Sequence, residues 1–230
     1  MEPWNIPKMW EGGDCWIIGG GVSMPRQFGI SEEVIENVNS KQDSIAAYSD
    51  YLSLLHDKHV IGVNVAFMLG SWISVLYFCD PGFFRSYKDD ILDFHNIKAT
   101  CVNHLDRNLM PLTRNIKRLK RDMRYGLSTK ADTICWNFNS GGAAIDFAAH
   151  TGVKRILLLG FDMKYIDKRS HWHAGYQTYI KPINPASFRR FLRSFYAIAS
   201  DAKRRRIEIL NVSMDSAIKE IPKVQLKDVI

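Results

Sequence analysis

The stretch "TICWNFNSGGAAIDFAAHTGVKRILLLGFDM", residues 133–163, decides the fold because it holds a complete strand, helix and strand unit. The apolar runs at 133–138 and 155–160 are continuous rather than alternating, as in parallel strands buried on both faces. Between them, 141–152 carries apolar residues at helical spacing and ends on Gly152, a common residue just after a helix. We therefore predict an α/β fold.

The same alternation of short apolar runs and helical segments extends through the chain. Further strands are predicted at 15–20, 59–64, 74–79, 98–103 and 207–212. A long helix is predicted with Asn184 as N-cap, Pro185 as its first residue, and Phe188 and Phe195 on one apolar face. The sequence shows no internal repeat and no strong linker. We expect one domain over residues 1–230, with a mostly parallel, Rossmann-like sheet flanked by helices.

The composition bounds the partners and the compartment. A net charge of +7 and a pI near 9.2 favour contact with something anionic. The four cysteines lie in or beside apolar runs without a CxxC pair, and no signal peptide is visible, so we expect a reduced, cytoplasmic protein. No apolar run approaches the roughly 20 residues that cross a bilayer, so no transmembrane segment is expected. A peripheral location at the inner membrane face stays open.

Positive charge is concentrated in the segment 114–124 and again at 203–206. We expect the first cluster to form a surface for the acceptor or for another anionic partner. Its members are Arg114, Lys117, Arg118, Lys120, Arg121 and Arg124. The alternative for each cluster is a solvated basic helix face.

Small and polar residues follow several predicted strands, where a doubly wound sheet binds its ligands. Glycines let the backbone approach a phosphate or a sugar, and the free N–H groups at a helix start attract anions. We expect nucleotide binding at Gly19, Gly20, Gly21, Ser23, Asn64, Ser140, Gly141, Gly142 and Asp162. The glycine loop matches neither the dinucleotide fingerprint nor the P-loop, so a tight turn is the alternative. Asp80 has no second carboxylate at DxD spacing, and we expect no metal site.

The segment "RSHWHAGY", residues 169–176, places two histidines in a predicted loop. We expect the imidazoles of His171 and His173 to point apart, and no cysteine or further histidine lies nearby, so a zinc site is poorly supported. Two roles remain: aromatic packing over a pocket, and a general base, since imidazole titrates near neutrality. We favour His171 as the base. His173 would orient the acceptor or stabilise the leaving phosphate.

The order of these motifs resembles that of a known family. The series "IIGGGVS", "IGVNVAF", "NSGGAAIDFAAHTGVKRILLLGFDM", "SHWHAGY" and "IEILNVSMDS" is similar to the bacterial lipo-oligosaccharide sialyltransferases, which use CMP-sialic acid, and to related phage and bacterial proteins. The similarity runs from about Cys15 to Ser216. It implies a GT-A-like domain without a DxD metal site and direct inverting transfer with a histidine as base.

The resemblance also implies roles for individual residues. It places nucleotide contacts on the glycine loop, on Asn64 and on the helix start at 140–141, and the base on His171. The family's phosphate-gripping tyrosines have candidate counterparts in Tyr165, Tyr176 and Tyr179. We include Tyr176 among the catalytic residues. The family loop usually reads GNGPS, whereas this chain has Gly20 in place of the asparagine and Val22 in place of the proline.

With what the resemblance implies about the donor and the inverting transfer, these observations predict a metal-independent inverting glycosyltransferase with a CMP-linked nucleotide sugar as co-substrate and no other cofactor. The segment 165–185 would form a lid over the active site, and the acceptor would be a glycan or a lipid-linked sugar. Three alternatives stay open: a phage-type glycosyltransferase that modifies a hydroxylated base in DNA, a nucleotide-binding module without catalysis, and a pyrophosphokinase-like enzyme. A homo-oligomer is compatible with the sequence.

Overall fold

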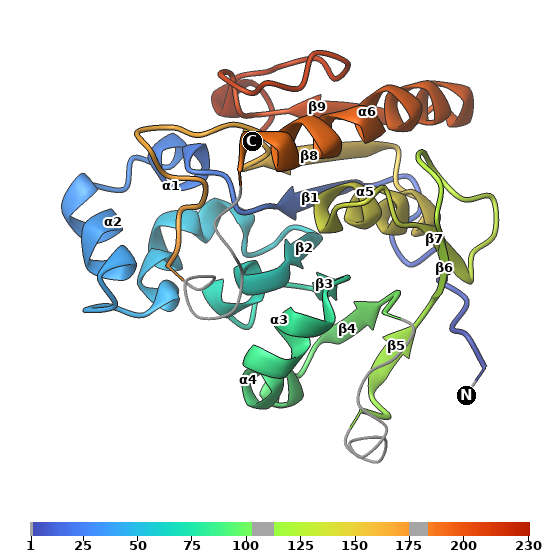
Figure 1. The fold of residues 1–230 in the computed structure, drawn as a ribbon, viewed down its shortest axis with the longest axis horizontal. Coiled ribbons are helices and arrows are strands. Elements are labelled where there is room, and N and C mark those ends of the chain that lie inside the picture. The colour runs from blue at the N-terminus through green and yellow to red at the C-terminus, as the bar shows by residue number, and fades with distance from the viewer. Residues whose placement is uncertain (1, 103–112, 175–183) are drawn as a thin grey trace.

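The structure is a computed structural model that describes residues 2–102, 113–174 and 184–230. Within these ranges, seven parallel strands form the central sheet (Figure 1). They are β1 (Asp14–Ile18), β2 (Val60–Val63), β3 (Val75–Phe78), β4 (Ile97–Thr100), β5 (Ile116–Arg118), β8 (Arg155–Leu159) and β9 (Glu208–Asn211). The chain thus forms a single Rossmann-like α/β domain, and the predicted fold class is confirmed.

The strand order determines where this sheet can bind a ligand. The order is β5, β4, β3, β2, β1, β8, β9, so the chain moves outward from β1 to β5 and then returns to place β8 on the other side of β1. Ile18 is in register with Leu159, so the loops that follow β1 and β8 leave the sheet side by side. Open α/β sheets bind ligands at such a reversal of strand order, beyond the carboxyl ends of the strands.

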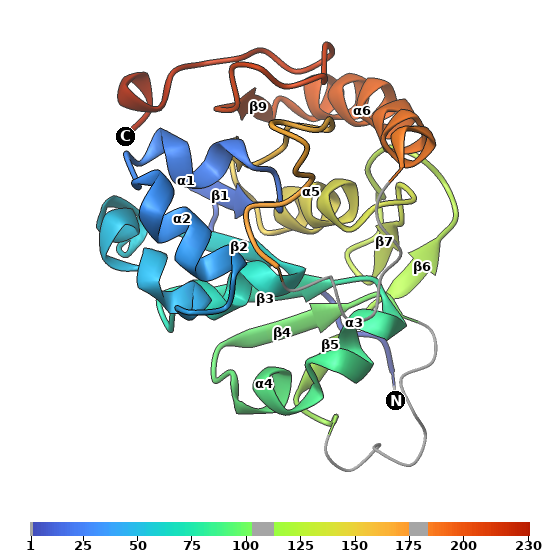
Figure 2. The ribbon, with the colours of Figure 1, turned by 60° about the vertical axis from the view of Figure 1, so that its left-hand side comes forward.

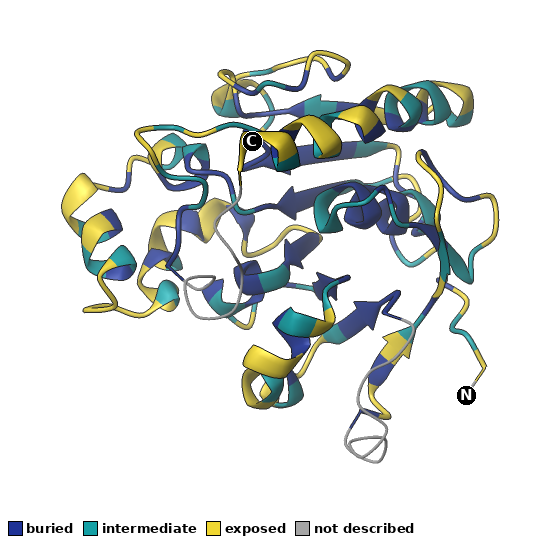
Figure 3. Ribbon diagram, in the orientation of Figure 1, coloured by how far each residue is buried: buried dark blue, intermediate teal, exposed yellow. Residues whose placement is uncertain are grey.

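Helices cover both faces of the sheet (Figure 2). In β1, Cys15 and Ile17 point into the core under α5 (Ser140–His150) and α6 (Pro185–Arg205), and Trp16 and Ile18 point into the opposite core. The opposite core is covered by α1 (Ser23–Gln27), α2 (Glu32–Asn39), η1 (Ile45–Tyr48), η2 (Asp50–Leu55), η3 (Asn64–Leu69), α3 (Pro81–Ser86) and α4 (Lys88–Asp93). The inner strands are buried on both faces, which is why they read as continuous apolar runs, whereas the edge strands β5 and β9 each expose a charged residue (Figure 3).

The predicted strand at 133–138 does not belong to the central sheet. Thr133–Cys135 forms β7, which pairs with β6 (Lys120–Asp122) in a separate ladder of two strands among the described residues. β7 leads directly into the turn before α5. Its apolar residues pack against that helix and therefore gave the same sequence pattern as a strand of the sheet.

The basic segment 114–124 contains β5 and β6, so the alternative of a basic helix face is wrong for it. Ile116 and Leu119 are buried, while Lys117 is exposed. β5 pairs with β4 at the edge of the sheet, where charged side chains are common and discourage pairing with another chain. These charges obscured the strand pattern.

Both predicted helices are confirmed, together with their end signals. Asn184 is the N-cap of α6, and its side-chain oxygen accepts from the Ser187 N–H at 2.9 Å, with Pro185 as the first helical residue. α5 ends at His150, and Gly152 follows in the left-handed conformation with φ of 89°.

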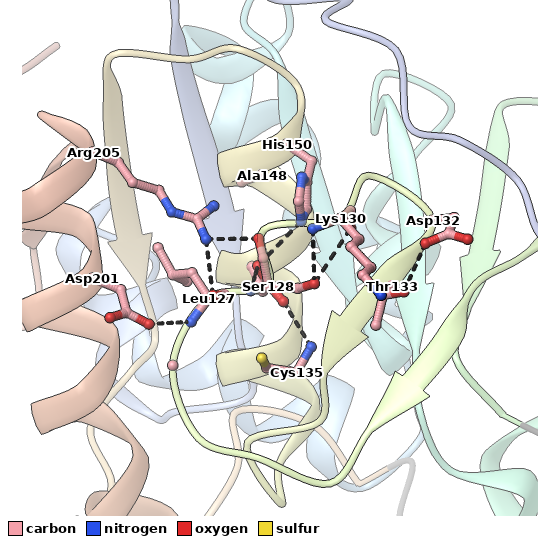
Figure 4. Close-up of polar contacts among 12 residues, drawn as sticks. Leu127, Ser128, Lys130, Asp132, Thr133, Cys135, Ala148, His150, Asp201 and Arg205 are labelled. Carbon is pink, nitrogen blue, oxygen red and sulfur yellow. Dashed lines mark hydrogen bonds and ion pairs between the residues drawn. The ribbon is translucent and has the colours of Figure 1, made fainter.

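The loop between β6 and β7 is fixed to α6 (Figure 4). Arg205 donates to the carbonyls of Leu127 and Ser128 at 2.8 and 2.6 Å, and the Asp201 carboxylate accepts from the Leu127 N–H at 2.8 Å. These bonds hold the small ladder beside α6. They therefore help to place the turn that starts α5.

Candidate functional site

A cavity of about 680 Å³ opens at the carboxyl ends of the central strands. Most of the predicted nucleotide-binding residues line it, and so does the predicted base: Gly19, Gly20, Gly21, Asn64, Ser140, Gly141, Asp162 and His171. These residues follow β1, β2, β7 and β8, so the fold brings together positions that are far apart in the sequence. The cavity lies at the reversal of strand order, as expected for a doubly wound sheet.

The glycine loop after β1 is packed too closely for side chains. A Cβ at Gly21 would lie 2.5 Å from the Gly160 carbonyl oxygen, and one at Gly19 would lie 2.9 Å from the same atom. Gly19 and Gly21 donate their N–H groups to the carbonyls of Leu159 and Gly160, both at 2.8 Å. The glycines thus let the loops after β1 and β8 touch. Two of their three N–H groups are bonded within the protein rather than free for a phosphate.

Asp162 fastens this loop to the end of β8. Its carboxylate accepts from the Ser23 N–H at 2.9 Å and from the Ser23 hydroxyl at 2.5 Å. The Ser23 hydroxyl is also 2.8 Å from that of Ser213, and Ser23 lies outside the cavity lining. The structure therefore gives Asp162 and Ser23 a positioning role, and direct contact with a nucleotide stays a prediction for both.

Asn64 presents a buried amide oxygen at the cavity. The residue has a left-handed backbone with φ of 52°, which asparagine tolerates better than most residues. Its Oδ1 is buried without a hydrogen-bond partner among the described residues, and Asn64 lines the cavity. Leaving a buried acceptor unpaired costs about 1–3 kcal/mol. This oxygen is therefore suited to accept a hydrogen bond from a ligand N–H group.

The start of α5 supplies the expected anion site. The N-cap Asn139 accepts from the Gly142 N–H at 2.6 Å, so the Gly142 N–H group is occupied. Ser140 and Gly141 line the cavity, and their N–H groups have no partner within the described ranges. Free N–H groups and the positive end of the helix dipole favour an anion at this place.

Arg121 adds a fixed positive charge to the cavity. Its guanidinium donates to the carbonyls of Cys101 and Cys79, both at 2.9 Å, and lies 4.7 Å from the centre of the Trp136 ring. These contacts hold the group at the carboxyl ends of β3 and β4 and leave further N–H donors for a ligand. The exposed Arg190 of α6 also lines the cavity.

The structure divides the predicted basic cluster. Arg121 joins the cavity, whereas the other members lie outside its lining: Arg114, Lys117, Arg118, Lys120 and Arg124. Lys120 pairs with Asp132 at 2.6 Å, and Arg124 pairs with Asp122 at 2.7 Å. Part of the positive charge is thus neutralised on the chain itself, and an acceptor surface at these five residues stays a prediction.

Trp172 anchors the histidine segment to the glycine loop. Its ring N–H donates to the Gly19 carbonyl at 2.8 Å, its backbone N–H donates to the Gly20 carbonyl at 3.0 Å, and its side chain is fully buried. His171 is thereby held against Gly20, where an added Cβ would lie 2.6 Å from the imidazole Cδ2. An asparagine at Gly20, as in the resembling family, would displace His171.

The two imidazoles do not point apart as expected. Their centres are 5.3 Å apart, because the chain bends at residues 172–174 instead of running straight. His171 lines the cavity, its Nδ1 is 2.9 Å from the Ser170 hydroxyl, and burial lowers its pKa to about 4. His173 is 5 % exposed and lies outside the lining, and burial, with a smaller contribution from His171, lowers its pKa. Of the two, His171 is the one placed to meet a ligand.

Aromatic side chains form the apolar wall of the cavity and were not among the predicted site residues: Trp136, Phe138, Phe161, Phe188 and Phe191. In the sequence they could not be told from core residues, and Phe188 was expected only on the apolar face of its helix. The one available signal was the position of Trp136 and Phe138 beside the predicted helix start. Asn137 and Phe138 turn the chain there with φ of 55° and 56°.

Two of the three candidate tyrosines lie outside the described residues, Tyr176 and Tyr179, and so does most of the second half of the predicted lid. Tyr165 is 38 % exposed, and its ring centre is 5.4 Å from that of Phe188, in the cavity wall. A role for these tyrosines and for a lid at 165–185 stays a prediction.

Within the part of the chain that the structure describes, no three histidine, cysteine, aspartate or glutamate side chains are grouped so that they could hold a metal ion. None of the described helices has the length and apolar character to cross a membrane. Comparison of the chain with protein-family models, curated proteins and solved structures finds no match.

Proposed function

We propose that the chain is a metal-independent inverting glycosyltransferase with a CMP-linked sugar as donor. The observation that carries the proposal is the composition of the cavity. It combines the free start of α5, the Arg121 guanidinium, the unpaired Asn64 amide oxygen and the His171 imidazole. Its volume of about 680 Å³ suits a small-molecule site, which typically spans roughly 300–1,000 Å³.

The donor nucleotide would be held by its phosphate and by its base. The phosphate would accept hydrogen bonds from the N–H groups of Ser140 and Gly141 and from Arg121, which together supply positive potential without a cation. Cytosine carries an exocyclic amino group that donates hydrogen bonds. Asn64 Oδ1 would accept from that group.

His171 would remove the proton from the acceptor hydroxyl. Because burial lowers the pKa of its imidazole to about 4, the ring is neutral at pH 7 and can take up a proton. As the acceptor oxygen attacks the anomeric carbon, the bond to the phosphate breaks and the phosphate leaves with the electron pair. The helix start and Arg121 would stabilise that developing charge with fixed donors.

A nucleotide-binding module without catalysis is the second candidate. A base with a pKa near 4 transfers protons less effectively than one matched to neutral pH, and this observation favours the module. The two candidates share the cavity and differ in turnover.

Donor consumption tests the proposal. The protein would be incubated in EDTA with CMP-sialic acid and a lipo-oligosaccharide, and in parallel with DNA that contains hydroxymethylated bases. We expect CMP release that depends on the lipo-oligosaccharide. Release only with DNA would support the DNA-modifying alternative. Binding of CMP without consumption of any CMP-, UDP- or GDP-linked sugar would contradict the enzyme and leave the binding module.

A further inference from the structure

Two cysteines meet beside the cavity. Cys79 and Cys101 directly follow β3 and β4, whose last residues, Phe78 and Thr100, are in register. Their sulfur atoms are 3.4 Å apart, and both cysteines are free thiols. Neighbouring strands lie about 4.8 Å apart, and disulfides bridge Cα separations of about 4.4–6.8 Å, so the backbone spacing admits a bond between them.

One cysteine of the pair faces the cavity, and the other has a lowered pKa. Cys79 is 4 % exposed and lines the cavity, whereas Cys101 is fully buried behind it. The hydrogen bond with Cys79, aided by Tyr77 and by Arg121, lowers the pKa of the Cys101 thiol to about 6. A lowered pKa favours the thiolate, which is the form of a cysteine that reacts with peroxides.

We propose that Cys79 and Cys101 are a redox pair, oxidised by small hydroperoxides that enter through the cavity, and that their disulfide strengthens anion binding at Arg121. Arg121 couples the pair to the site, because its guanidinium donates to the carbonyls of both cysteines. In the reduced state the thiolate offsets part of the Arg121 charge. The disulfide is neutral, so the full charge acts on a bound anion.

The reaction balances with one hydroperoxide. Cys79, which faces the cavity, first passes its thiol proton to the Cys101 thiolate, whose sulfur is 3.4 Å away. The Cys79 thiolate formed in this way attacks one oxygen of hydrogen peroxide, the O–O bond breaks, and Cys79 becomes a sulfenic acid. The hydroxide that leaves takes the proton of the Cys101 thiol and becomes water. The Cys101 thiolate then attacks the Cys79 sulfur, forms the disulfide and expels hydroxide. Two thiol sulfurs are oxidised by two electrons in all, and the peroxide is reduced to water and hydroxide.

The bond itself can be tested without any nucleotide. The double variant that carries both Cys15→Ala and Cys135→Ala keeps only the two cysteines of the proposed pair. It would be treated with hydrogen peroxide, alkylated and measured by mass spectrometry. The protein with its unmodified sequence would be treated in the same way and analysed by peptide mapping. We expect the loss of two hydrogens and no alkylation, with a Cys79–Cys101 linked peptide in both proteins. With Cys101→Ala added, Cys79 should instead gain oxygen. A failure to form the linked peptide in the unmodified sequence would overturn the proposal.

The effect on the site is tested with inorganic pyrophosphate. Calorimetric titration should show that pyrophosphate binds on the order of tenfold more tightly to the oxidised protein than to the reduced protein. The double variant that carries both Cys79→Ala and Cys101→Ala should bind pyrophosphate equally well under the two conditions. Equal affinity in both redox states would overturn the coupling to Arg121. The proposed effect of the disulfide on anion binding rests on the proposed function, whereas the formation of the disulfide does not. A linked peptide in a protein that binds no nucleotide would therefore contradict the proposed function and leave the redox pair standing.

Discussion

Gly20 and His171 share one space, and this single pair connects the glycine loop to the proposed base. The imidazole lies where a side chain at residue 20 would begin, and Trp172 holds it there through the carbonyls of Gly19 and Gly20. The departure of this chain from the GNGPS loop of the resembling family thus has a local physical reason. Gly20 lacks the polar side chain of the family's asparagine, and this leaves the space that the His171 imidazole occupies.

Replacement of Gly21 tests the close packing at the end of β1. In Gly21→Ala the new Cβ would lie 2.5 Å from the Gly160 carbonyl oxygen and 2.6 Å from an Asp162 carboxylate oxygen. We expect a loss of about 1–3 kcal/mol in the free energy of unfolding, measured by urea denaturation. Gly13→Ala is the matched control, since its nearest neighbour would be at an ordinary 3.4 Å. Equal stability of the two variants would contradict the packing described.

Replacement of His171 tests its role as base. Loss of a general base typically costs roughly 10²- to 10⁴-fold in rate, so His171→Ala should lower kcat far more than it changes the Kd of CMP. His173→Ala, outside the cavity lining, should lose less. Because the base must be unprotonated, kcat/KM of the wild type should rise with pH through about 4. Near-normal turnover of His171→Ala beside an inactive His173→Ala would show that the wrong histidine is named.

At the scale of elements, end signals and burial decided what the sequence could predict. α5 and α6 were predictable because Asn184, Pro185 and Gly152 favour helix ends through local conformation and hydrogen bonding, and tertiary packing did not change these ends. β5 was not, because this edge strand exposes Lys117 and gives no apolar run. The cavity lining was predictable where glycine or a polar residue follows a strand. Its aromatic wall was not, because an aromatic residue reads the same in a core and in a cavity.

The buried Asp146 ties α5 to the ladder beside it. Its carboxyl oxygens accept from the N–H groups of Ser128 and Cys135 at 2.9 and 2.7 Å. Asp146→Ala would leave two buried donors unpaired, and at about 1–3 kcal/mol each we expect a loss of about 2–6 kcal/mol in the free energy of unfolding. Chemical denaturation measures it. The exposed Asp215→Ala should leave the midpoint unchanged, and a midpoint equally unaffected in Asp146→Ala would contradict the tie.

At the scale of the whole molecule, buried titrating groups set the pH range of stability. Burial lowers the pKa of His150 and His171 to about 4 and that of His173 well below 6.5. Between pH 6.5 and 4 the unfolded chain therefore binds more protons, and the free energy of unfolding falls as the pH falls. Burial raises the pKa of Asp146 to about 8, so this group makes the free energy of unfolding rise as the pH falls. It is one group, whereas three histidines act in the opposite direction.

Urea denaturation at pH 7, 6 and 5 measures this balance. We expect the free energy of unfolding to decrease at each step, because three histidines favour the unfolded state on protonation and one aspartate opposes them. His150→Gln should flatten the decrease. A protein that is equally stable or more stable at pH 5 than at pH 7 would contradict the burial of these histidines in their neutral form.

The whole fold places one cavity at the reversal of strand order, and the central claim is that this cavity binds a cytidine nucleotide without a metal ion. Thermal unfolding with CMP, CDP, UDP, GDP and ADP in EDTA tests the claim most directly. A ligand at a hundredfold its Kd stabilises by about 2.7 kcal/mol. The account predicts the largest rise in Tm with a cytidine nucleotide, a reduced rise in Arg121→Gln, and an unchanged rise in Arg124→Gln, whose side chain lies outside the lining. No rise with any nucleotide, or a rise that requires a divalent cation, would contradict it.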